Sequence, residues 1–345
     1  MMNYEEFKQT VREELEKLFP EEYEIDIRTV QKVNQELDGI TVIRRDAKVN
    51  SSPTIYAKDM YKEYENGKRL DEILTSAHLS IMENMENGER IAALVDFDAA
   101  KENIVFELIN TEQNKSLLQN VPNRSWNDLS IIYRWIMESG REGNASAIVT
   151  HNLAERLGLN EEQLFDLAKE NTKRLRPVQI KSMSDIIKEM LLEEDLPKQI
   201  QELILPIRFF QEHEMYVITN NGRTNGAAGI LYEEELHKLS EQLGADLYIL
   251  PSSIHETIAI SADFGTPEEL TRMVQEVNAE ELEPEDKLSD NVYHYDRETR
   301  EITLAMDAPA IGKERDLAED IQVQTAPTQD EPTMNKINPI LGRGR

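Results

Sequence analysis

The sequence predicts an α+β protein in which amphipathic helices pack on antiparallel sheets, arranged in two or three lobes and followed by a disordered C-terminal tail. Three observations predict this class. Several segments repeat apolar residues every three or four positions, others alternate apolar and polar residues, and 345 residues exceed the roughly 150 typical of one domain.

The first lobe is expected over residues 1–90. Its opening segment predicts an amphipathic helix that ends at Pro20. The segments "YEIDIRTVQKV" and "LDGITVIRR", around the pair Asp38-Gly39, predict strands with one buried face. The remainder, to Met85, is expected to be mostly helical. The apolar face of the first helix comprises Tyr4, Phe7, Val11, Leu15 and Leu18.

The middle lobe is expected over residues 91–181. Strands are predicted at "NIVFELIN", "DLSIIYRWIM" and "ASAIVT". They lead into a helix at "NEEQLFDLAKENTKRL", where Asn160 and Gln163 fit a capping box. A helical connector over residues 182–209, kinked at Pro197, is expected to join this lobe to the next.

The C-terminal lobe is expected over residues 210–306. The order predicted is a strand, a tight turn at Asn221-Gly222, a strand of small residues, a helix ending at Gly244, two strands and a last helix. Residues 307–345 are rich in proline, threonine and charge without an apolar period, which predicts disorder. The last helix is expected to start with the capping set Thr266, Pro267 and Glu269 and to bury Leu270, Met273, Val274 and Val277.

The amino-acid composition limits the cellular compartment in which we expect the protein and the classes of partner that it can bind. The net charge of -29 repels polyanions, so nucleic acid is not an expected partner, and neither is an anionic membrane. The chain has no cysteine, which excludes disulfides and thiolate metal sites. No apolar run approaches about 18 residues and no secretory signal opens the chain. We therefore expect a cytoplasmic protein without a membrane span.

The stretch "LPSSIHE" is the first candidate site, because it places Ser252, Ser253, His255 and Glu256 within a few positions of one another. If a strand begins at Ile254, alternation separates His255 from Glu256. Ser253 and His255 would then lie about 6.5 to 7 Å apart, too far for a nucleophile–base hydrogen bond. No G-x-S-x-G motif precedes the serines. The sequence therefore favours a structural corner over a hydrolase site.

Glu256 is the unusual residue of this corner, because the predicted alternation places it on an apolar face. It would need a buried partner, as a structural anchor or as the floor of a pocket. Asn225, from the preceding turn, completes the candidate binding corner with Ser252, Ser253, His255 and Glu256.

A second candidate is the basic stretch "TKRLRPVQIK", which concentrates positive charge in an acidic chain. It could contact phosphates or an acidic partner. The ordinary explanation is a helix C-terminus, where cations complement the dipole. The histidines show no metal-ligand spacing, so no metal and no cofactor are predicted. The basic patch comprises Lys173, Arg174, Arg176 and Lys181.

Four segments, "VPNRSWNDLSIIYRW", "MYVITNNGRTNGAAGILY", "ADLYILPSSIHETIAI" and "VNAEELEPEDKLSDNVYHYD", resemble the bacterial domain of unknown function 5688. The likeness covers most of residues 1–303. That family occurs in Gram-positive anaerobes, often on mobile elements. It has no established activity, so the resemblance supplies no catalytic residues.

We therefore predict a non-catalytic binding or accessory protein, associated with mobile-element biology, that has a protein partner. One alternative is a hydrolase-like enzyme with its site near the corner between Pro251 and Glu256. A second alternative is an accessory protein that contacts nucleic acid through the basic patch and the terminal arginines.

Overall fold

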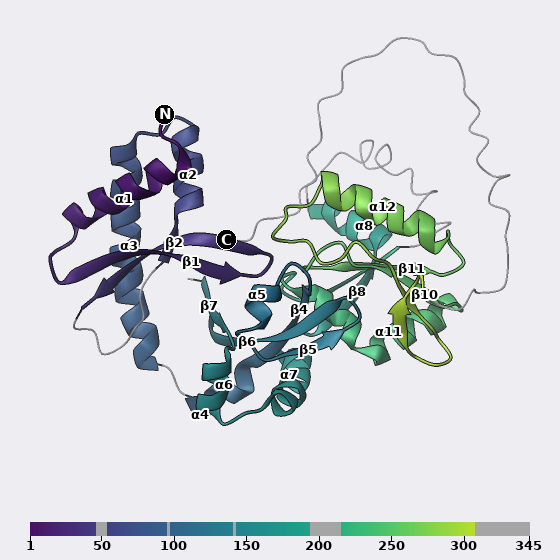
Figure 1. Ribbon diagram of the computed structural model, residues 1–345. Helices are drawn as coiled ribbons and strands as arrows, with labels where there is room; N and C mark the ends of the chain where they lie inside the picture. The colour runs from purple at the N-terminus through teal and green to yellow at the C-terminus, as the bar shows by residue number, and fades with distance from the viewer. Residues whose placement is uncertain (46–53, 95–96, 141–142, 194–214, 308–345) are drawn as a thin grey trace, which may run out of the picture.

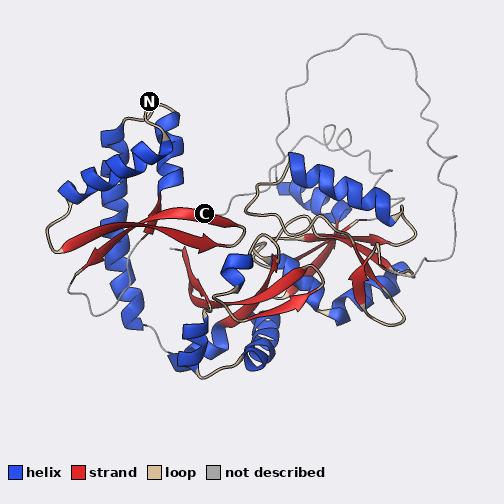
Figure 2. Cartoon of the chain, viewed as in Figure 1, coloured by secondary structure: helices blue, strands red, loops and turns tan. Residues whose placement is uncertain are grey.

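The computed structural model describes residues 1–45, 54–94, 97–140, 143–193 and 215–307. It confirms an α+β fold in which helices pack on antiparallel sheets (Figure 1; Figure 2). None of the described helices combines the length and the apolar character needed to cross a bilayer. The predicted tail, 307–345, lies outside the described residues apart from its first residue, and so does the predicted kink at Pro197.

The N-terminal lobe packs three helices on one face of a sheet of order β1-β2-β3 (Figure 1). The predicted strands are present, but they join at Val33 and Asn34, whereas Asp38 and Gly39 lie inside β2. Phe7 from α1 and Ile40 from β2 are fully buried in this lobe's own core. The elements are α1 (Tyr4–Leu18), β1 (Tyr23–Lys32), β2 (Gln35–Arg44), β3 (Thr54–Tyr56), α2 (Ala57–Glu65) and α3 (Leu70–Leu94).

The middle lobe is built on a sheet in which β6 is flanked by β4 and β5 and also pairs with β7. The three predicted strands and the capping box of α7 are confirmed. The elements are α4 (Phe97–Ala100), η1 (Lys101–Asn103), β4 (Ile104–Asn110), α5 (Lys115–Leu118), β5 (Asn123–Trp126), β6 (Leu129–Gly140), β7 (Gly143–Ile148), α6 (His151–Leu157) and α7 (Glu161–Leu175).

The C-terminal lobe has a sheet of order β13-β12-β10-β11-β9-β8, with α8 and α12 on one face and α11 on the other (Figure 1). The capping box of α12 and the left-handed Gly244 after α11 are confirmed. The elements are β8 (Val178–Ser182), α8 (Met183–Glu193), β9 (Tyr216–Asn220), η2 (Gly226–Leu231), α11 (Glu233–Leu243), β10 (Leu247–Leu250), β11 (Thr257–Ser261), α12 (Pro267–Glu280), β12 (Tyr293–Tyr295) and β13 (Ile302–Leu304).

Two sequence predictions about this lobe are wrong. The small residues after Asn225 form the 3-10 helix η2, not a strand. On α12, Met273 and Val277 are 48% and 45% exposed, so they do not belong to its buried stripe. Leu270 and Val274 are buried, with Asn278 continuing the same face because its amide donates to Ser289 O.

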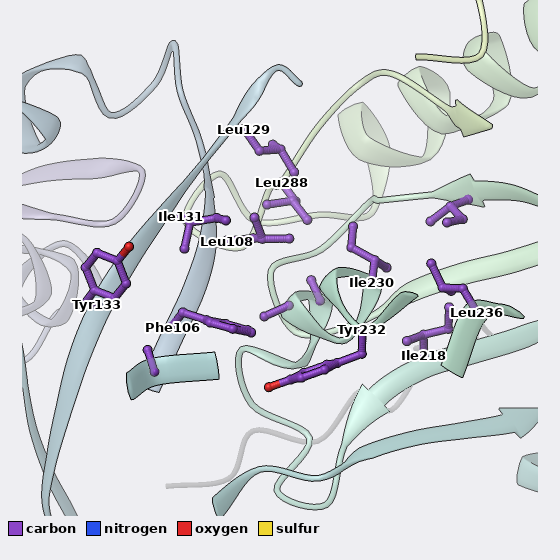
Figure 3. Close-up of a cluster of buried hydrophobic side chains, with 14 of the residues drawn as sticks. Phe106, Leu108, Leu129, Ile131, Tyr133, Ile218, Ile230, Tyr232, Leu236 and Leu288 are labelled. Carbon is purple, nitrogen blue, oxygen red and sulfur yellow. The ribbon is translucent and has the colours of Figure 1, made fainter. Parts of the chain in front are cut away.

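The middle and C-terminal lobes share one hydrophobic core (Figure 3). Phe106 and Ile131 of the middle sheet pack in the same cluster as Ile218, Ile230 and Tyr232 of the C-terminal lobe. Apolar burial is the main favourable term in folding, so a continuous core fixes the two sheets relative to each other.

The N-terminal lobe meets the other two lobes at the β1–β2 turn. Asn34 adopts a left-handed φ of 60° there, a conformation that asparagine tolerates better than most residues. Its N–H donates to Asn114 Oδ1, and Asn114 Nδ2 donates back to Asn34 Oδ1, both at 2.7 Å. Asn34 Nδ2 donates to the carbonyls of Glu285 and Lys287. One asparagine therefore bonds to the middle and C-terminal lobes together.

We expect Asn34→Gly to loosen this junction, because glycine keeps the left-handed turn but removes the side-chain hydrogen bonds. Unfolding free energy should fall by about 1–3 kcal/mol. Amide hydrogen exchange should accelerate around residues 110–118 and 283–288. Unchanged exchange in both segments would show that Asn34 does not hold the lobes together.

Candidate functional site

The corner between β10 and β11 is held by main-chain hydrogen bonds. The predicted strand from Ile254 is wrong in its start, because β11 begins at Thr257. Ser253 forms an isolated bridge with Lys287, and Ile254 N donates to Asp286 O. The segment before β12 is thus hydrogen-bonded along the corner and holds it in place. Ser252 takes part through its carbonyl, which accepts from Leu288 N.

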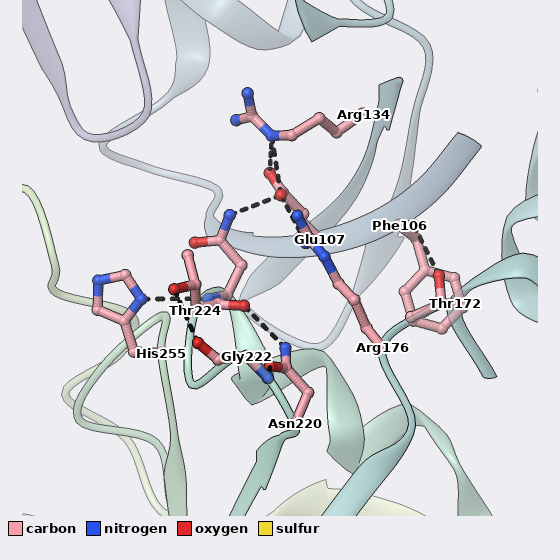
Figure 4. Close-up of polar contacts among 10 residues, drawn as sticks. Phe106, Glu107, Arg134, Thr172, Arg176, Asn220, Gly222, Thr224 and His255 are labelled. Atoms are coloured by element: carbon pink, nitrogen blue, oxygen red, sulfur yellow. Dashed lines mark hydrogen bonds and ion pairs between the residues drawn. The ribbon is translucent and has the colours of Figure 1, made fainter. Parts of the chain in front are cut away.

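Both ring nitrogens of His255 are engaged within the protein. Nδ1 accepts a hydrogen bond from the backbone N–H of Asn225 at 3.1 Å (Figure 4). In the neutral ring the proton is therefore on Nε2, which donates to Asp286 Oδ1 at 3.1 Å. His255 thus links the loop after β9 to the loop before β12.

Serine chemistry is not supported by this geometry. Ser253 Oγ accepts a hydrogen bond from the backbone N–H of His255 at 3.0 Å, and Ser253 is buried. An activated serine instead donates its proton to a free base nitrogen. Both ring nitrogens of His255 already have partners, so these residues do not form a nucleophile–base pair.

Asn225 connects the corner to a buried charge. It has a left-handed φ of 51°, and its Nδ2 donates to Glu107 Oε1 at 2.5 Å. The next residue, Gly226, must lack a side chain, because a Cβ there would lie 2.3 Å from Thr219 Oγ1 and 2.6 Å from His255 O. This close approach is what the small residues of "NGAAG" permit.

Glu107 lies in the middle of β4 with only 3% of its side chain exposed. Arg134 Nε lies 2.8 Å from both carboxylate oxygens, and Arg176 Nη1 lies 3.0 Å from Oε1 (Figure 4). Burial alone would raise the pKa of Glu107, but these two guanidinium groups and the Asn225 amide lower it below its usual range. Glu107 is therefore a buried carboxylate held in its charged form.

Glu256 differs from Glu107, because its half-buried carboxylate has no hydrogen bond to any described residue. Burial raises its pKa above the usual range, and the nearby charges of His255 and Arg223 offset only part of this. Arg223 itself has a left-handed φ of 50° on the loop after β9. The predicted buried partner is thus missing among the described residues.

The predicted basic patch is divided among four separate contacts. Lys173 pairs with Glu234, Lys181 with Glu189, and Arg176 with Glu107. Arg174 donates to the carbonyl of Glu102 and to Asn171 Oδ1. These contacts favour the structural explanation of the patch, and its role in binding stays a prediction.

Among the described residues, no group of three or more metal-ligating side chains is placed to hold an ion. Glu107, Arg134 and Asp286 are not among the site residues that the sequence predicts. A signal for the first was available, because Glu107 interrupts the apolar run "NIVFELIN". An acidic residue inside a strand buried on both faces needs charged partners.

The fold and the corner define an α+β protein whose three lobes meet at a junction of hydrogen bonds and charged side chains. The chain belongs to the Family of unknown function (DUF5688), whose match covers residues 4–297. This confirms the resemblance found in the sequence. Comparison with curated proteins and comparison with solved structures gave no match.

We expect Glu107→Gln to lower the unfolding free energy by about 3 kcal/mol, because it leaves two largely buried guanidinium groups without a counter-charge. Urea unfolding measures this. Glu189→Gln is the matched control, since the same change in an exposed pair with Lys181 should cost below about 1 kcal/mol. Equal effects of the two substitutions would contradict the role assigned to Glu107.

The raised pKa of Glu256 predicts that the unfolding free energy depends on pH. A carboxyl whose pKa is raised in the folded state binds its proton more tightly there, so its contribution is present at low pH and is lost as pH rises through the folded pKa. Glu256→Gln should therefore flatten the fall in unfolding free energy that begins as pH rises above the ordinary glutamate pKa of about 4.3. Glu276→Gln, exposed on α12, is the control. Parallel profiles for wild type and Glu256→Gln would refute the assignment.

Proposed function

We propose that this protein is a non-catalytic binding protein that holds a basic segment of a protein partner at the corner formed by Asn225, Ser252, Ser253, His255 and Glu256. This proposal rests on the burial of the Glu256 carboxylate and on its missing hydrogen-bond donor. Its carboxylate is half-buried, its pKa is raised by burial, and no described residue donates to it. An arginine, a lysine or a backbone N–H from a partner would supply the missing donor.

The rest of the corner supports binding over catalysis. His255 is fixed at both ring nitrogens and Ser253 accepts from the backbone, so neither is poised for proton transfer. The same bonds make the corner rigid, which lowers the entropic cost of binding. For the hydrolase-like alternative, His255 would first have to break both of these hydrogen bonds.

The accessory role in mobile-element biology and the cytoplasmic location are part of this proposal. The first is supported only by the resemblance to domain of unknown function 5688, and the second by the absence of cysteine. The nucleic-acid alternative is weaker, because each residue of the basic patch already has a partner within the chain.

The test is affinity capture from the native cytosol with the full chain, followed by a binding titration of the recovered protein. We expect Glu256→Gln to weaken binding at least tenfold, about 1.4 kcal/mol, by removing the charge that pairs with the partner. Glu276→Gln, a change of the same charge on the exposed face of α12, should bind as wild type does.

Recovery of no partner, or equal affinity of Glu256→Gln and wild type, would refute the proposal. Ester hydrolysis by wild type that Ser253→Ala abolishes would favour the enzyme alternative instead.

A further inference from the structure

β1 is a ten-residue edge strand whose outer side pairs with no other strand among the described residues. The register pairs Tyr23 with Arg44, and Arg45 N donates to Glu22 O. Hydrogen-bonded pairs alternate along an antiparallel ladder, so Glu24, Asp26 and Arg28 bond inward to β2. The N–H and C=O groups of Ile25, Ile27, Thr29 and Gln31 therefore point outward, and within the described chain they meet no partner.

Two natural protections of an edge strand are absent from β1, and the charged side chains along it are the protection that remains. The strand contains no proline, no bulge interrupts its register with β2, and it is longer than most strands. Only Ile25 is fully buried along it, so its other side chains are accessible to a neighbouring strand. Such an edge is a template for strand addition.

Charge along β1 identifies which strand would fit. Glu22 directly precedes the strand, the first half carries Glu24 and Asp26, and the second half carries Arg28 and Lys32. Asp26 and Arg28 lie on the face away from the helices, are 43% and 55% exposed, and form an ion pair with each other at 2.9 Å. A strand that pairs antiparallel with β1 should therefore be basic at its C-terminal end and acidic at its N-terminal end. β1 itself has this pattern.

We propose that two copies of this chain associate through β1, antiparallel and related by a two-fold axis at Ile27. The outward groups of Ile27 then bond to those of Ile27 in the second copy, and Ile25 pairs with Thr29. On the other face Asp26 lies opposite Arg28, and Glu22 lies opposite Lys32, each pair twice. No like charges face each other in this register.

The two nearest alternative registers are disfavoured by charge. Only registers that pair outward-pointing residues can form ladder bonds, so the axis passes through a residue and never between two residues, and the nearest alternatives to Ile27 are Asp26 and Arg28. An axis at Arg28 would place the two Arg28 side chains opposite each other, and an axis at Asp26 would do the same for the aspartates. Like charges directly opposite are destabilising. The dimer would join the two sheets in the order β3-β2-β1-β1-β2-β3.

The test is sedimentation equilibrium of the full chain and of charge variants. Wild type is expected to form dimers. Asp26→Arg and Arg28→Asp should each weaken homodimerisation about tenfold, because each creates like-charge pairs across the axis. An equimolar mixture of the two single variants should recover wild-type affinity as a heterodimer, and so should the double variant Asp26→Arg/Arg28→Asp.

Matched controls are Glu14→Lys and Lys17→Glu, which make the same changes of net charge on the exposed α1 pair. They should dimerise as wild type does. Thr29→Pro tests the backbone, since it removes an outward N–H from an exposed residue without touching the β1–β2 ladder. It should abolish dimerisation while thermal melts show a folded chain.

A wild type that stays monomeric over the concentration range would overturn the proposal. So would single variants that dimerise as wild type does, or a mixture that fails to form heterodimers. Failure of this proposal can be distinguished from failure of the proposed corner function, because the β1 variants change no residue of the corner and Glu256→Gln changes no residue of β1.

Discussion

The charge buried at Glu107 is the constraint on which the arrangement of the middle and C-terminal lobes depends. A carboxylate with almost no exposure costs several kcal/mol unless charges and hydrogen bonds compensate it. Compensation here comes from Arg134 on the neighbouring strand, from Arg176 after α7, and from Asn225 on the loop after β9. Both guanidinium groups come from the middle lobe, and docking of the C-terminal lobe adds the Asn225 amide, so this directional hydrogen bond favours one arrangement of the two lobes in a way that an apolar contact would not.

From this charge a continuous series of polar contacts crosses the molecule. Asn225 bonds to Glu107 by its side chain and to His255 by its backbone, and His255 bonds to Asp286. The residues on either side of Asp286 accept from Asn34 at the tip of the N-terminal lobe. The stretch that resembles a hydrolase site in sequence is therefore the junction of three lobes.

Local signals predicted local structure well. The capping boxes at Asn160 and Thr266 are defined by neighbouring residues alone, and both are present. The Glu107 cluster could not be predicted in the same way, because its partners lie 27, 69 and 118 positions away in sequence. Periodicity can nominate a buried residue such as Glu107, but only the tertiary fold selects its partners.

The errors have the same origin. Helical spacing allows two overlapping stripes of buried side chains on α12. The structure buries Leu270 and Val274 together with Asn278, because the Asn278 side-chain amide donates a hydrogen bond to a backbone carbonyl. The small residues after Asn225 are typical of a strand in sequence, yet they form a 3-10 helix. The small residues there allow close packing against Thr219 and His255. A local propensity for extended structure takes no account of such a tertiary contact.

The two proposed surfaces are not mechanically independent. β1 ends at Lys32, one residue before the turn in which Asn34 contacts the carbonyls on both sides of Asp286. Asp286 in turn orients His255, next to Glu256. A second copy bound at β1 would therefore pair with the strand that leads into the turn contacting the corner's supporting segment. Coupling through this turn would need no movement of a lobe, and faster or slower amide exchange at residues 283–288 on dimerisation would measure it.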